Sequence, residues 1–176
     1  MMRLATWMGV IGVILAIPLV AMRYTDEVAW TRVDFIAAGA MLGAAALAYE
    51  LATMNKASLA YRAAIALAVG TALMLLWVNG AVGVLGDEAN AANLIFLGVI
   101  AVGVIGAVVA GLRSPRMAYA MIATAFAQIV AAMIALIFSW GAATEVALTA
   151  AFSLGWFASA YLFHLAARGQ KPKSDA

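Results

Sequence analysis

Apolar blocks of about 20 residues alternate along this chain with short polar segments. A block of that length, wound as a helix that rises about 1.5 Å per residue, crosses roughly 30 Å of hydrocarbon. The polar segments are rich in Gly, Pro, Asn and charged residues, which favour turns. The pattern predicts an all-α integral membrane helical bundle with six transmembrane helices and short connections. The predicted spans are 4–22, 33–53, 59–79, 94–112, 117–139 and 146–167, with turns at 55–58, 113–116 and 140–141.

Basic residues give this bundle an orientation, because Lys and Arg are retained on the cytoplasmic side of a membrane. We therefore expect both termini in the cytoplasm, in one transmembrane domain over residues 1–167 followed by a short basic tail, residues 168–176. Eight basic residues fall inside, Arg3, Lys56, Arg62, Arg113, Arg116, Arg168, Lys171 and Lys173, and two outside, Arg23 and Arg32. Six acids fall outside, Asp26, Glu27, Asp34, Asp87, Glu88 and Glu145, and two inside, Glu50 and Asp175.

The first span also has some features of a signal peptide, because Arg3 precedes its apolar run. That run is long for a signal peptide, and residues 18–22 lack the small-residue pattern of a cleavage site. We expect a retained helix. Cleavage would leave five spans and an amino terminus outside, with the rest of the topology unchanged.

Composition narrows the function classes. Hydrophobic residues make up 68% of the chain and charged residues 10%, against about 45–50% and 25% in soluble domains. The absence of cysteine excludes disulfides and thiolate metal sites, and one histidine, His164, cannot supply paired haem ligands. A net charge of +2 is too small to indicate a nucleic-acid partner. No hydrolase or phosphate-loop motif occurs, no lysine lies in a predicted span, and no cofactor is implied.

Small residues at helical spacing predict where helices pack. In lipid, helices associate by close backbone approach rather than by burial from water. We call such stripes of small residues helix seams. They indicate compact folding of the chain or contact between two copies of it, and the alternative is a path for a solute between the helices. The predicted packing glycines are Gly39 and Gly43 in the second span and Gly103, Gly106 and Gly111 in the fourth. The fifth span carries a similar stripe, Ala120, Thr124, Ala127, Gln128, Ala131 and Ala135.

Residues 77–93 form the densest polar segment. Either the third helix is long and tilted, continuing to Leu85, or it breaks near Asn79 and runs along the outer interface. At such a break the Asn79 amide would satisfy freed backbone groups. Asn90 or Asn93 is placed to cap the fourth helix.

The outer acids present two interpretations. They are either solvated loop residues or, if the two loops converge, an acidic vestibule that binds a hard cation or a basic partner. Their spacing matches no EF-hand. The candidate outer-face residues are Asp26, Glu27, Asp34, Asn79, Asp87, Glu88, Asn90 and Asn93.

Two polar residues fall within predicted spans. Glu50 lies in the last turn of its span, where Lys56 or Arg62 could neutralise it, an interpretation we favour over proton carriage. Gln128 is nearest a membrane midplane, and we expect an interhelical hydrogen bond rather than a selectivity element. His164 is expected at the boundary with solvent.

Four stretches of the first 95 residues carry a family resemblance: 17–22, 25–28 with Trp30, Asp34 and Phe35, 49–51, and 77–79 with 81–83, Gly86, Glu88, Asn90 and Asn93. They resemble a family of small bacterial multi-pass inner-membrane proteins with no assigned activity. The resemblance implies a bacterial inner membrane and supplies no catalytic residues.

These observations favour a non-enzymatic accessory, assembly or scaffolding subunit that acts through helix seams and an acidic outer face. Its expected partners are the lipid bilayer and either a second copy or another membrane protein. The alternative is a small channel or transporter for a cation or small solute, with a path from the outer acids past Gln128 toward Glu50.

Overall fold

A computed structural model describes residues 2–54, 58–81, 83–86 and 90–169. Within those ranges all regular structure is helical. The helices are α1 (Met2–Ala21), α2 (Arg32–Thr53), α3 (Leu59–Ala81), the 3₁₀ turn η1 (Ala91–Leu94), α4 (Ile95–Ala110), α5 (Ser114–Ile137) and α6 (Ala143–Arg168).

Five helical segments in this part of the chain are long and apolar enough to cross a membrane: α2, α3, η1 with α4, α5 and α6. Residues Ala5–Ala21 of α1 form a shorter apolar helix. The chain is thus all-helical with several candidate spans, as a multi-pass membrane protein requires. The count of six spans and the side of each terminus stay predictions.

The chain divides into two compact units, unit 1 (Met1–Leu51) and unit 2 (Ala52–Ala176). The prediction of one transmembrane domain over residues 1–167 stays a prediction, and each unit is described by itself.

Unit 1 is a pair of helices, α1 and α2, that touch at two levels. The Trp7 indole N–H donates to Glu50 Oε1 at 2.9 Å. Further along, Leu15 Cδ1 lies 3.7 Å from the position that a Cβ would take on Gly39. Because Trp7 precedes Leu15 while Glu50 follows Gly39, the two helices run in opposite directions.

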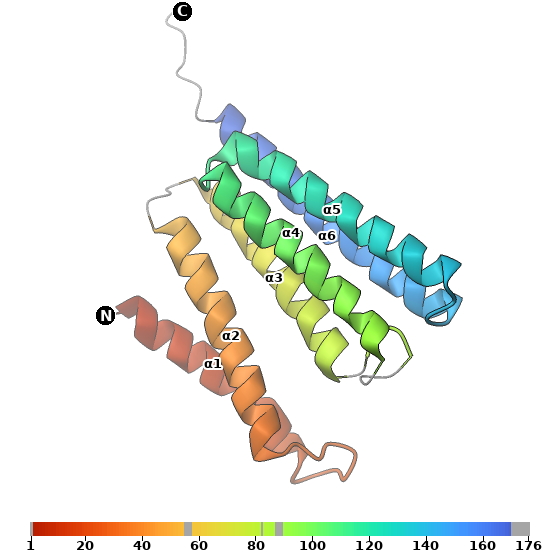
Figure 1. The fold of residues 1–176 in the computed structure, drawn as a ribbon. Coiled ribbons are helices and arrows are strands. Elements are labelled where there is room, and N and C mark those ends of the chain that lie inside the picture. Colours follow the sequence, from red (N-terminus) through yellow and green to blue (C-terminus); the bar gives the residue numbers. More distant parts are fainter. Residues whose placement is uncertain (1, 55–57, 82, 87–89, 170–176) are drawn as a thin grey trace, which may run out of the picture. The chain divides into compact units, whose positions relative to one another are not determined.

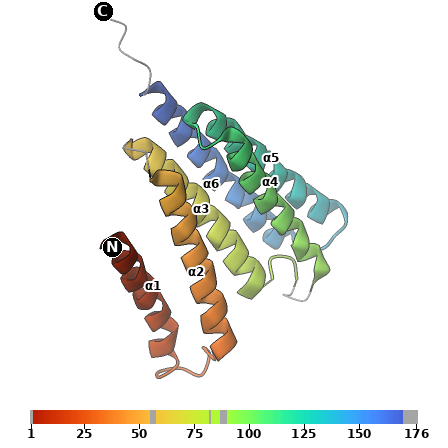
Figure 2. The same ribbon diagram turned by 60° about the vertical axis from the view of Figure 1, so that its left-hand side comes forward.

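Unit 2 holds α3, α4, α5 and α6 in an up-and-down arrangement (Figure 1). Helix α6 packs on α3 and α5, and α4 packs on α5 (Figure 2). At one end the Tyr61 hydroxyl donates to the Leu112 carbonyl at 2.9 Å, and its ring meets Phe163 edge to face. These contacts bring the start of α3, the α4–α5 turn and the end of α6 together.

The chain between α3 and α4 turns back into the unit. Helix α3 ends at Ala81, and Val84 and Leu85 are buried in an apolar cluster with Leu75, Phe96 and Val146. Gly83 and Gly86 adopt φ of 76° and 77°, which glycine accepts without strain and which redirect the chain. The helix therefore does not continue to Leu85. It ends two residues after Asn79, close to the predicted break, but the chain then returns to the core instead of running along the outer interface.

Two other predicted connections shift. The turn predicted at residues 113–116 lies earlier, because α5 begins at Ser114 with Pro115 in its first turn. Proline is accepted there because the first helical N–H groups have no intrahelical acceptor. The predicted turn at 140–141 extends over the residues between Ile137 and Ala143. Of the turn predicted at 55–58, residues 55–57 lie outside the described ranges.

Candidate functional site

Three asparagines and a glutamate of unit 2 gather at the end opposite Tyr61. Among them Asn93 is buried, with 5% of its surface exposed. Its side-chain oxygen Oδ1 accepts the backbone N–H groups of Val84 at 3.2 Å and Leu85 at 2.9 Å. One amide oxygen therefore satisfies both donors of the segment that turns back into the core. We call Asn79, Asn90, Asn93, Glu145 and the backbone groups that they bind the amide cap.

Asn79 and Asn90 tie the neighbouring segments to Asn93. The Asn79 amide in α3 donates to the Asn93 carbonyl at 3.2 Å. Asn90 Oδ1 accepts the Ala92 N–H at 3.0 Å and so caps η1, the turn that leads into α4. The Asn90 amide donates in the other direction, to the carbonyls of Leu85 at 2.9 Å and Trp140 at 3.3 Å.

Glu145 joins the two connections at this end of unit 2. Its Oε2 accepts the N–H of Gly86 at 3.1 Å and the N–H of Ala142 at 3.0 Å. From the sequence, Glu145 was expected only as an outer acid. The available signal was its position three residues after Ala142 at the start of a helix, where Glu reaches back to the preceding backbone.

The amide cap is a device for holding loop backbone in one shape. Its side chains bind peptide groups of both connections, so Gly86 and Asn90 are each fixed. The sequence places Asp87 and Glu88 between these two anchors, and both acids lie outside the described residues. Asn79 Oδ1 is buried with no hydrogen-bond partner among the described groups.

The three predicted outer acids of unit 1 are one helix-capping residue and two loop residues. Asp34 Oδ2 accepts the Thr31 N–H at 2.6 Å and its hydroxyl at 2.8 Å, so the Asp34 carboxylate fixes the start of α2. Asp26 and Glu27 are exposed in the connection between α1 and α2. Convergence of these acids with Asp87 and Glu88 stays a prediction.

Several buried polar side chains lie within the helices of unit 2. The Gln128 amide in α5 donates to the Thr149 carbonyl in α6 at 3.1 Å, which is the interhelical bond expected of it. The hydroxyls donate to backbone carbonyls at 2.6–2.9 Å, from Thr71 to Leu67, Thr124 to Ala120, Thr149 to Val146 and Ser159 to Ala64. Gln128 Oε1 and Trp156 Nε1 are buried without a partner in the part of the chain that the structure describes.

Glu50 has a contact that its sequence neighbours did not indicate. Its carboxylate accepts the Trp7 indole N–H, and the Trp7 and Tyr49 rings meet edge to face at 5.8 Å. Of the two cations expected beside it, Lys56 lies outside the described residues and Arg62 belongs to unit 2.

The packing glycines have different surroundings. A Cβ on Gly103 would lie 3.4 Å from Thr124 Oγ1, and one on Gly106 would lie 3.0 Å from Ala120 Cβ, so both glycines face α5. Gly39 approaches Leu15, while a Cβ on Gly43 would meet nothing within 4 Å. Gly111 differs from the predicted seam, because it is exposed and ends α4 in a left-handed conformation with φ of 56°.

No group of three or more His, Cys, Asp or Glu side chains that could hold a metal ion occurs in the described ranges. Comparison with protein-family models, curated proteins and solved structures found no match to this chain. What the protein does has to be inferred from its own geometry.

Proposed function

We propose that the protein is a non-enzymatic accessory, assembly or scaffolding subunit of a bacterial inner membrane, with both termini in the cytoplasm. It binds a partner protein at the outer end of unit 2. The observation that carries the proposal is the amide cap, which anchors Gly86 and Asn90 on either side of the acidic pair. Because Gly86 and Asn90 are already held by hydrogen bonds, a partner that binds them has less backbone to order.

The chemistry of the partner follows from the distribution of charge within unit 2. Residues 63–112 and 117–167 contain no Lys or Arg. The arginines in the described part of unit 2 are Arg62, Arg113, Arg116 and Arg168, which belong to the end opposite the amide cap. A partner with Lys or Arg at the membrane surface would relieve the repulsion between Asp87 and Glu88 and gain rate and specificity from the opposite charge.

The test compares the double variant Asp87→Asn/Glu88→Gln with the parent chain after purification in mild detergent. Both replacements keep size and hydrogen-bonding capacity while removing charge, so the level of protein in the membrane should not change. Proteins that co-purify with the parent should be lost from the double variant. Asp175→Asn, a charge removal in the tail, is the matched control and should retain them. Equal recovery of partners from the parent and the double variant would refute the proposal.

A small channel or transporter for a cation or small solute is the second candidate, favoured by the buried Gln128 Oε1 without a partner. A carbonyl oxygen in a dry interior is a potential ligand for a hard cation or a water molecule. We place this function second because the neighbouring hydroxyls donate to carbonyls of the helices themselves. Purified chain in liposomes should then pass cations, and Gln128→Met, of similar length, should abolish the flux. A stable heteromeric partner with no flux favours the first function.

A further inference from the structure

A groove of about 870 Å³ runs along the surface of unit 2 between α5 and α6. Its α5 side follows one helical stripe, Pro115, Ala118, Tyr119 and Ile122, spaced three and four residues apart. The α6 side is a similar stripe that extends from Phe157 to Arg168.

The groove has a physical cause in the choice of side chains. Ala118 and Ala160 are buried, with 8% and 5% of their surface exposed, and these small residues leave the space between the helices unfilled. Tyr119 and Tyr161 also line the groove but are largely exposed. Their long side chains form its walls, and the buried alanines form its base. The result is an open, mainly apolar channel rather than an enclosed cavity.

The length of the groove fits one leaflet of a bilayer. Arg168 and Phe157 are eleven residues apart in α6, which corresponds to about 16 Å along a helix. Half of a hydrocarbon core of about 30 Å is about 15 Å. Near the deep end, the rings of Phe157 and Phe126 meet edge to face at 5.8 Å. An acyl chain of one leaflet therefore fits between the basic end and this ring pair.

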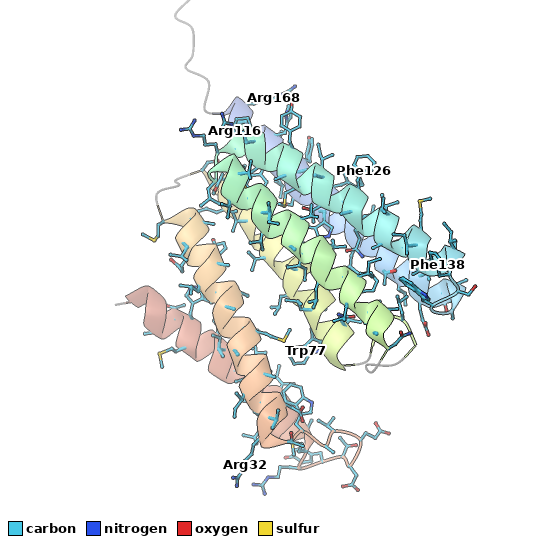
Figure 3. All side chains as sticks on the ribbon, viewed as in Figure 1. Arg32, Trp77, Arg116, Phe126, Phe138 and Arg168 are labelled. Carbon is cyan, nitrogen blue, oxygen red and sulfur yellow. The ribbon has the colours of Figure 1, made fainter. Side chains whose placement is uncertain are left out.

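The end of the groove near the start of α5 and the end of α6 is basic. His164 and Arg168 line it from the last turns of α6, and Figure 3 shows Arg116, in the first turn of α5, at the same end. Within the described part of unit 2 the acidic residue is Glu145, which lies at the opposite end in the amide cap. No carboxylate of the described part of unit 2 therefore lies beside Arg116 or Arg168.

The partial charges at the helix ends do not determine the sign of the electrostatic potential at this end of the groove. Helix α5 begins and α6 ends at the same place, and their partial charges of about +0.5 and −0.5 offset each other. The guanidinium groups therefore set a positive potential. Arginine binds phosphate through paired N–H donors, and near a membrane surface this geometry recognises an anionic headgroup.

We propose that the groove between α5 and α6 binds one anionic phospholipid, with its phosphate at Arg168, the arginine that lines the groove, and one acyl chain lying over Ala118 and Ala160. The lipid belongs to the leaflet that meets the basic end of unit 2. The site is separate from the amide cap and does not depend on the function proposed above.

The test uses the full chain in mild detergent and native mass spectrometry to count bound lipids during titration with phosphatidylglycerol or phosphatidylcholine. The parent should bind phosphatidylglycerol first, as a single tight adduct. Arg168→Gln should weaken that adduct about five- to tenfold, the effect of losing one charge-assisted hydrogen bond near a surface. Binding of phosphatidylcholine should not change. Arg168→Met, of similar length and without charge, is a second headgroup variant should the first be unstable.

Two further variants distinguish lipid binding in the groove from unspecific electrostatic attraction of anionic lipid to the basic end. Arg113→Gln removes the same charge at the same end, from a residue that does not line the groove, and should leave the adduct intact. Ile122→Trp keeps every arginine but fills the apolar part of the groove, where Ile122 is 36% exposed, and should weaken the adduct.

Three outcomes would overturn the proposal. Equal losses in Arg113→Gln and Arg168→Gln would mean unspecific electrostatic attraction. An Ile122→Trp variant with parental binding would mean that no acyl chain occupies the groove. Displacement of the lipid by millimolar inorganic phosphate would assign the arginines to free phosphate instead.

Discussion

The two ends of unit 2 are held by different kinds of contact. At the amide cap, four side chains from three segments direct hydrogen bonds at backbone groups of both connections. At the basic end, one hydroxyl bonds the α4–α5 turn, and the ring of the same residue, Tyr61, packs on Phe163. The cap end holds the described backbone of residues 84–86 by hydrogen bonds, whereas the basic end carries exposed charge close to the helix termini.

The difference follows from the length of the connections. The α4–α5 turn needs only the residues between Ala110 and Ser114, with Gly111 and Leu112 in the left-handed region. The α3–α4 connection spans residues 82–90. A longer connection has more peptide groups to satisfy, and in a membrane water cannot satisfy those that are buried. The amide side chains of the cap supply the missing partners.

Asn93→Ala should have the largest effect on stability. It removes the acceptor of the Val84 and Leu85 N–H groups, which remain buried. We expect a loss of about 3 kcal/mol, because each buried group left without a partner costs about 1–3 kcal/mol. Thermal unfolding in detergent measures it. Asn93→Asp keeps an oxygen acceptor and should lose less. The cap would not be a stabilising device if the alanine and aspartate variants unfolded at the same temperature.

Gly106→Leu tests the seam between the two ends and should cost about 2 kcal/mol, the usual range for overpacking being about 1–3 kcal/mol. A Cβ there already lies 3.0 Å from that of Ala120, so the leucine would hold α4 and α5 apart. Val104→Leu is the matched control, since Val104 is 58% exposed. Equal thermal stability and expression of the two variants would remove the argument for the seam.

Some of this structure was predictable from the apolar pattern. Block length placed α2 and α3 within two residues of their observed ends, and the small-residue stripe placed Gly103 and Gly106 against a neighbouring helix. Both inferences use information local to one helix. The start of α5 was missed because Pro115 was taken as part of a turn, although proline is also accepted in a first helical turn.

The candidate site was less predictable because its contacts join distant segments. Asn79, Asn90 and Asn93 were singled out from their own neighbourhood, but Glu145 meets Gly86 across 59 residues of sequence. Trp7 likewise reaches Glu50 across 43 residues, a pairing that no local pattern indicates. The break predicted near Asn79 did not indicate that Val84 and Leu85 would return to the core, with Gly83 and Gly86 at positive φ beside them.

Gly141→Ala and Gly111→Ala compare the two ends directly. At the cap, a Cβ on Gly141 would lie 2.6 Å from Glu145 Oε2 and 3.3 Å from Leu85 Cα, so the carboxylate must leave the Gly86 N–H. We expect about 1–2 kcal/mol from this overpacking. At the basic end, a Cβ on Gly111 would meet open space. The alanine there would only have to adopt the left-handed conformation of Gly111, which costs about 1 kcal/mol. Amide hydrogen exchange at residues 83–86 should accelerate in Gly141→Ala alone. Acceleration there in both variants would mean that the ends are not independent.

Tyr61→Phe should have the smallest effect, and it tests whether the basic end depends on directed hydrogen bonds as the cap does. The change removes the hydroxyl that donates to the Leu112 carbonyl and keeps the ring that packs on Phe163. Loss of one hydrogen bond costs about 1 kcal/mol, so the unfolding temperature in detergent should fall only slightly. Tyr61→Ala, which also removes a fully buried ring, should cost several times more. If Tyr61→Phe destabilises the protein as much as Asn93→Ala, one hydroxyl at the α4–α5 turn matters as much as the network of the cap. The contrast between the two ends would then be wrong.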